Sequence, residues 1–109
     1  MSARFVTTLR ARAVPIRLVA EGTTTVWTVR VQGAEVWDTV RVEVLPGTLV
    51  REVKQAAMAE LMPDIDTLDA YVVKHGGFEI TNEGASVQAA GAIDGSTFLI
   101  MARRRRPVR

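Results

Sequence analysis

The stretch VEVLPGTLVREVK, residues 42–54, changes its hydrophobic period halfway along. Before the turn, Val42 and Val44 alternate with polar residues, which is the period of two that is typical of a half-buried strand. After the turn, LVREVKQAAMAELM spaces its apolar residues three and four apart, which is typical of an amphipathic helix. Thr48 is the expected N-cap and Pro63 is expected to end the helix. The residues expected to face solvent are Arg51, Glu52, Lys54, Gln55 and Glu60.

Two strands are predicted on the N-terminal side of this stretch. In WTVRVQ, residues 27–32, apolar and polar residues alternate, and DTVRVEV, residues 38–44, repeats the alternation. The intervening GAEVW contains the glycine that a tight chain reversal favours. The two strands are therefore predicted to form an antiparallel hairpin.

Shorter strands are predicted on the C-terminal side. An acidic loop, PDIDTLD, is followed by YVVKH at 71–75, a glycine pair and FEI at 78–80. A long loop and an Asp-Gly turn then precede STFLIMA at 96–102. The predicted class is α+β with the order β-β-α-β-β-β. Its core is predicted from the inward positions of each period: Val29, Val31, Val40, Val42, Val44, Val50, Val53, Ala57, Leu61, Val73, Ile80, Val87, Phe98 and Ile100.

The ordered set of motifs resembles the ubiquitin-like β-grasp, in which a mixed sheet of four to five strands packs on one helix. The likeness rests on VEVLPGTLVREVK, YVVKHGGFEI and GAIDGSTFLIMARRRR, and it extends from Val26 to Arg106. It implies a non-catalytic interaction module. Among bacterial relatives the chain looks most like the YukD/EsaB group, which are cytoplasmic accessory proteins of type VII secretion systems.

The chain also departs from the ubiquitin pattern. Arg106 and Pro107 stand where the resemblance places the terminal diglycine, so conjugation to other proteins is not expected. Lys74 stands where ubiquitin presents the central isoleucine of its binding patch, and Met101 where it has a neighbouring valine, so ubiquitin receptors are not expected to bind. Two alternatives remain: a ubiquitin-like modifier or sulfur carrier, and an accessory subunit of a multicomponent oxygenase.

Charge is segregated along the chain, although the net charge is only +2. Residues 1–20 carry four arginines and no acid, residues 21–102 carry five basic against twelve acidic residues, and residues 103–109 carry five arginines. We expect residues 1–24 to be a disordered basic extension, with an edge strand at PIRLVA as the alternative. Residues 25–102 are expected to form the ubiquitin-like domain, followed by the Arg-rich tail.

Composition and motif spacing disfavour several classes of function. Cysteine is absent, so disulfides and thiolate chemistry are unavailable, which fits a cytoplasmic location, and no apolar run approaches a membrane span. His75 has no accompanying nucleophile or acid motif. Asp64, Asp66 and Asp69 lack the glycine and closing glutamate of a calcium loop. The glycines lack the spacing that cradles phosphate. We expect no enzyme activity, metal or cofactor.

A binding surface is predicted at the closing strand. Leu99 and Met101 are expected to face outward beside Lys74, and four arginines continue from that strand: Arg103, Arg104, Arg105 and Arg106. Apolar contact would supply affinity, and arginines pair carboxylates in bidentate fashion, so we expect a protein partner with an acidic surface, including a membrane-associated secretion component. Nucleic acid is disfavoured because the tail has no aromatic stacking residues and the body is acidic. The sequence does not indicate an oligomeric state.

Overall fold

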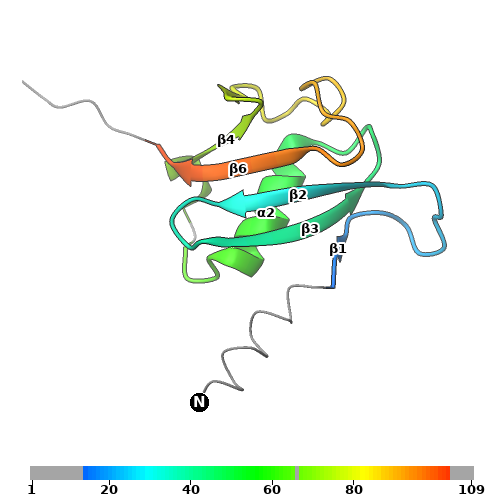
Figure 1. The fold of residues 1–109 in the computed structure, drawn as a ribbon, viewed down its shortest axis with the longest axis horizontal. Coiled ribbons are helices and arrows are strands. Elements are labelled where there is room, and N and C mark those ends of the chain that lie inside the picture. The colour runs from blue at the N-terminus through cyan, green and yellow to red at the C-terminus, as the bar shows by residue number, and fades with distance from the viewer. Residues whose placement is uncertain (1–13, 66, 104–109) are drawn as a thin grey trace, which may run out of the picture.

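The computed structural model describes residues 14–65 and 67–103 (Figure 1). Three tail arginines of the predicted binding surface, Arg104 to Arg106, lie outside these residues. No helix in the described part of the chain is long and apolar enough to cross a membrane. The elements in chain order are β1 (Ile16–Arg17), β2 (Trp27–Gly33), β3 (Asp38–Val44), α2 (Val50–Leu61), the 3-10 helix η1 (Leu68–Ala70), β4 (Tyr71–His75), β5 (Phe78–Glu79) and β6 (Thr97–Ala102).

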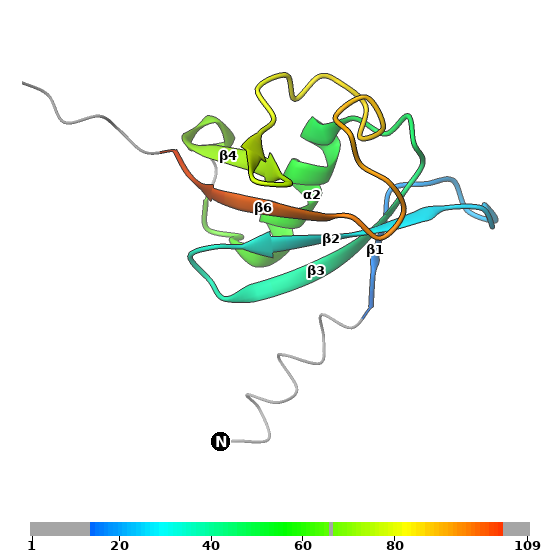
Figure 2. The same cartoon turned by 45° about the horizontal axis from the view of Figure 1, so that its top comes forward.

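The strands form one mixed sheet in the order β1-β3-β2-β6-β4-β5. The hairpin partners β2 and β3 are antiparallel, whereas β6 runs parallel to β2 and antiparallel to β4. The helix α2 lies on one face of this sheet in both views (Figures 1 and 2). This is the predicted α+β arrangement of one helix on a mixed sheet, with six strands in place of the four to five expected.

The sixth strand comes from the N-terminal segment. Ile16 pairs with Val42, Arg17 pairs with Glu43, and the two strands are parallel. The Arg17 guanidinium also forms an ion pair with the Glu43 carboxylate. Disorder over residues 1–24 is therefore the wrong expectation at β1, where the alternative edge strand forms; residues 1–13 lie outside the described residues. A strand edge presents unpaired backbone groups, and β1 satisfies some of those on β3.

The core lies between α2 and the sheet. All predicted core residues except Ile80 are at most 5% exposed, and Ile80 is half-buried and packs against the core. Met58, Met62 and Ala92 join the core although the sequence pattern does not single them out. Met58 follows the buried Ala57 directly, so the helix buries a wider face than a single stripe. The helix ends at Leu61, before the proline that was expected to stop it.

The helix begins differently from the prediction. Leu49, not Thr48, occupies the N-cap position of α2. The Thr48 hydroxyl instead accepts a hydrogen bond from the Leu45 amide at 3.0 Å, and the Glu52 carboxylate accepts one from the Leu49 amide at 3.0 Å. The first two helical amides donate to carbonyl oxygens in the loop at 83–85. A distant loop therefore satisfies the N–H groups that a local cap would otherwise bind.

The hairpin forms as predicted, but its glycine has another role. Gly33 is the last residue of β2 and pairs with Asp38. The left-handed backbone conformation in this turn belongs to Trp37, with φ 56°. A Cβ at Gly33 would lie 2.7 Å from the Cγ2 atom of Val36, so glycine is needed here for close approach.

Candidate interaction surface

The predicted strip on β4 and β6 faces away from the helix. Lys74 lies directly opposite Leu99, and Val72 lies opposite Met101. Because side chains alternate between the two faces of a sheet, and the intervening pair belongs to the helix-facing core, all four residues share the outward face. No other helix or strand in the described part of the chain covers that face (Figures 1 and 2). Neighbouring side chains nevertheless leave Val72 only 5% exposed, and Lys74, Leu99 and Met101 are half-buried. The structure thus brings Lys74, Leu99 and Met101 together as expected.

Two further arginines extend this surface. Arg30 of β2 lies opposite Arg41 of β3, and on its other side opposite Thr97 of β6. Both arginines are exposed. Like charges directly across a strand pair repel each other. Alternation identifies an outward arginine in each strand, but only the strand order shows where the two lie relative to Leu99. Gln32 is opposite Leu99, Arg30 lies diagonally from it, and Arg41 lies one strand farther away. We call the set of Arg30, Arg41, Lys74, Leu99 and Met101 the basic sheet face.

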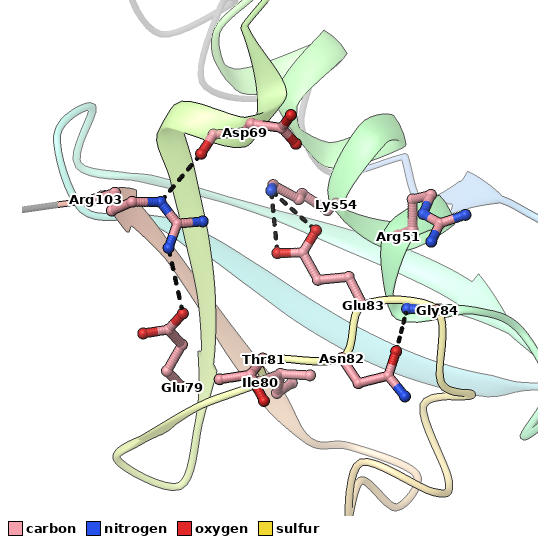
Figure 3. A pocket seen from close by; sticks show the side chains of 10 residues that line it. All are labelled: Arg51, Lys54, Asp69, Glu79, Ile80, Thr81, Asn82, Glu83, Gly84 and Arg103. Carbon is pink, nitrogen blue, oxygen red and sulfur yellow. Dashed lines mark hydrogen bonds and ion pairs between the residues drawn. The ribbon is translucent and has the colours of Figure 1, made fainter.

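Arg103 is the tail arginine that the structure describes, and it makes intramolecular contacts. Its backbone amide donates to the Ala70 carbonyl at 2.7 Å, and its Nε donates to the Asp69 carbonyl at 3.2 Å. Its guanidinium also lies 3.7 Å from the Glu79 carboxylate (Figure 3). Since β4 lies between β5 and β6, this ion pair spans β4. The two side chains are 53% and 38% exposed, so the pair contributes little stability and a partner carboxylate can compete for the guanidinium.

A polar pocket of about 440 Å³ adjoins this ion pair (Figure 3). In it, the Lys54 ammonium donates to both carboxylate oxygens of Glu83, at 3.0 and 3.1 Å. The Lys54 side chain is 2% exposed, so the expectation that it faces solvent is wrong. The helical period places Lys54 beside the buried Val53, and the loop after β5 supplies the carboxylate that makes its burial tolerable.

The pocket holds three basic and three acidic side chains, which leaves no net charge to attract an ion: Arg51, Lys54, Arg103, Asp69, Glu79 and Glu83. Among the described residues, no buried side-chain polar atom lacks a hydrogen-bond partner. Within the same residues, no group of three or more His, Asp or Glu side chains is placed to hold a metal ion. The balanced charges of the pocket account for it as a structural feature. His75 lies outside this pocket and packs against Phe98, with ring centroids 5.3 Å apart.

Comparisons with known proteins concern the fold. No protein-family model matches the chain, and no curated protein matches it. A ubiquitin of Caldiarchaeum subterraneum is similar in structure, with 18% identity, a TM-score of 0.61, and coverage of 74% of this chain and 98% of that one.

Two further solved structures give the same result. The ubiquitin-like domain of Plasmodium falciparum Dsk2 has 19% identity and a TM-score of 0.61, covering 72% of this chain and 100% of its own. A ubiquitin-like protein from Trypanosoma brucei has 23% identity and a TM-score of 0.61, covering 75% and 100%. The fold is therefore the ubiquitin-like β-grasp.

Proposed function

We propose that this chain is a non-catalytic interaction module that binds an acidic protein surface through its basic sheet face. The observation that carries the proposal is the half-buried apolar pair Leu99 and Met101 on the sheet face opposite the helix. Lys74 lies directly opposite Leu99, and Arg30 and Arg41 lie on the same face across β2 and β3. A flat face with central apolar groups and a charged rim has the anatomy of a protein interface.

The two kinds of side chain have separate roles in this proposal. Burying Leu99 and Met101 contributes affinity at about 25 cal/mol per Å² of apolar surface removed from water. The arginines bind carboxylates and exclude basic partners, and they speed the encounter with an acidic surface. Arg103 adds to them when a partner carboxylate replaces Glu79 at its guanidinium.

We further propose that the module is an accessory component of a type VII secretion system and acts in the cytoplasm. The support is the size and general look of the chain, together with Arg106 and Pro107 at the place of the diglycine, which resemble the YukD/EsaB group. Gene neighbourhood tests the assignment: genes for an ESX-like ATPase or WXG-type small secreted proteins nearby would support it. Neighbouring di-iron hydroxylase genes would favour the oxygenase subunit instead. Covalent adducts of this chain on other proteins, detected by mass spectrometry, would favour the modifier.

The surface itself is tested by affinity capture from the native cell, followed by titration of the purified partner. Three baits are compared: the wild type, Leu99→Ser/Met101→Ser, and a chain truncated after Ala102. Ile93→Ser is the matched control because Ile93 is an apolar residue, 68% exposed, outside the basic sheet face. We expect the control to retain the partner, the double variant to lose it, and the truncated chain to lose part of its salt sensitivity. If all baits recover the same partner in equal amounts and with equal salt sensitivity, the basic sheet face is not the binding surface.

A further inference from the structure

The end of the domain at the β2–β3 turn carries an apolar hollow. Its volume is about 340 Å³. The turn contributes one wall, and the end of α2 with the loop that follows contributes the other. The residues that matter for its chemistry are the apolar Val36, Leu61, Ile65 and Tyr71 and the acidic Glu35 and Asp64. We call this feature the acidic hollow.

Two of the apolar side chains that line the acidic hollow are partly exposed, and an exposed tryptophan is next to one of them in sequence. Val36 and Ile65 are each 37% exposed, and Trp37, which follows Val36, is 90% exposed. Trp37 also has a φ of 56°, a conformation that costs a residue with a side chain about 1 kcal/mol or more. A strained, solvent-exposed tryptophan gains nothing from folding by itself. Tryptophan is, however, among the residues most enriched at the centres of protein interfaces.

The charged side chains that line the hollow have one sign. They are the carboxylates of Glu35 and Asp64, and none of the lining residues is a lysine or an arginine. Glu35 keeps its carboxylate at the rim by accepting a hydrogen bond from the Ala102 amide at 3.2 Å. The two carboxylates favour a ligand that is basic as well as apolar.

We propose that the acidic hollow binds a basic peptide segment of a partner protein that carries one aliphatic anchor residue. The anchor fills the space between Val36 and Ile65. Flanking arginine or lysine side chains pair with Glu35 and Asp64, and a guanidinium stacks on the exposed indole of Trp37. This site adjoins the basic sheet face, since Ala102, which donates to Glu35, directly follows Met101. It takes a ligand of the opposite charge, so it stands whether or not the proposed function holds.

The probe is a fluorescein-labelled peptide, GRRLRRG, with GRRSRRG and GEELEEG as comparison peptides. Binding to the full chain is measured by fluorescence anisotropy, and the site is located by backbone amide shifts in NMR. We expect the largest shifts at residues 34–37 and 61–65. We expect the serine peptide to bind about fivefold more weakly and the glutamate peptide not to bind.

Two variants test whether Trp37 and Asp64 bind the peptide. Trp37→Asn keeps a residue that tolerates positive φ, and Asp64→Lys reverses a charge at an exposed position. We expect each to weaken GRRLRRG binding about tenfold. Phe78→Ser is the matched control, since Phe78 is an aromatic residue, 79% exposed, on β5 and outside the hollow. It should leave binding unchanged, and circular dichroism should show all three variants folded.

Four outcomes would overturn the proposal. The first is no GRRLRRG binding at roughly 1 mM peptide. The second is that GRRLRRG causes its largest backbone amide shift changes in NMR at Lys74 and Leu99. The third is at least fivefold tighter peptide binding by a chain truncated after Arg103, which would mean that the chain's own tail occupies the hollow. The fourth is self-association of the full chain, measured by sedimentation, that Trp37→Asn abolishes, which would make a second copy the occupant.

Discussion

The basic sheet face and the acidic hollow both present apolar side chains to solvent, yet the charges beside them have opposite sign. Leu99 and Met101 share a sheet face with Lys74, Arg30 and Arg41, whereas the carboxylates of Glu35 and Asp64 line the hollow. The net charge of +2 describes neither region. The basic residues gather because alternation directs side chains from separate strands to one face. The acidic residues gather because a turn and a loop meet at one end of the domain. The kind of partner that each region can bind is therefore set by the charges next to that region and not by the net charge of the chain.

The largest expected effect comes from removing the sheet that supports both regions. Ile100→Asp places an unpaired charge at a position that is 0% exposed. It should unfold the domain, whose total stability is of the order of 5–15 kcal/mol, and abolish binding at both surfaces. The adjacent Leu99→Ser, on the outward face, should keep a cooperative thermal transition. A transition unchanged by Ile100→Asp in circular dichroism would show the face assignment to be wrong.

The second prediction concerns the buried charge of Lys54, which, unlike the surface charges of the two regions, depends on a partner inside the domain. Glu83→Ala leaves the ammonium of Lys54 buried without its partner and should lower the free energy of unfolding by about 3 kcal/mol. Lys54→Met should cost clearly less, because Glu83 is 21% exposed and can reach water. The double variant should lie close to the wild type in urea unfolding. Equal costs for the two single variants would contradict this asymmetry.

The third prediction separates the two regions by charge reversal. Arg30→Glu/Arg41→Glu should weaken binding of the acidic partner at least tenfold, a change of about 1.4 kcal/mol, and leave GRRLRRG binding within about twofold. Asp64→Lys should weaken GRRLRRG binding about tenfold and leave binding of the acidic partner within about twofold. Isothermal titration of each variant with both ligands checks this. If both affinities fall together in either variant, the two regions do not act independently.

The smallest expected effect concerns backbone strain beside the hollow. Trp37→Asn should leave the thermal transition unchanged or raise it slightly, because asparagine tolerates the left-handed region and the lost side chain is 90% exposed. Trp37→Val should lower the free energy of unfolding by about 1 kcal/mol, since a β-branched residue fits that region poorly. Equal stability of the two variants would mean that the turn relaxes and stores no strain.

Much of the fold is predictable from local pattern. Alternation identifies β2 and β3, and the change of period near Thr48 places α2 within a residue of its observed start. The outward direction of Lys74 and Leu99 follows from the same alternation, but their pairing depends on the register of β4 and β6. Arg30 and Arg41 join that face only through the order of strands in the sheet, and the acidic hollow requires the meeting of residues 34–37 with residues 61–65.

The sequence by itself determined which residues alternate, where the helix lies and which side chains form the core, because these depend on the spacing of neighbours along the chain. Tertiary structure decided the β1 pairing, the burial of Lys54 and the capping of α2. Each of these depends on a partner far away in sequence: 26 residues separate Arg17 from Glu43, and 29 separate Lys54 from Glu83. Hydrophobic periodicity encodes burial, but it does not say which distant group will satisfy a charge or a free amide, since that requires the folded geometry.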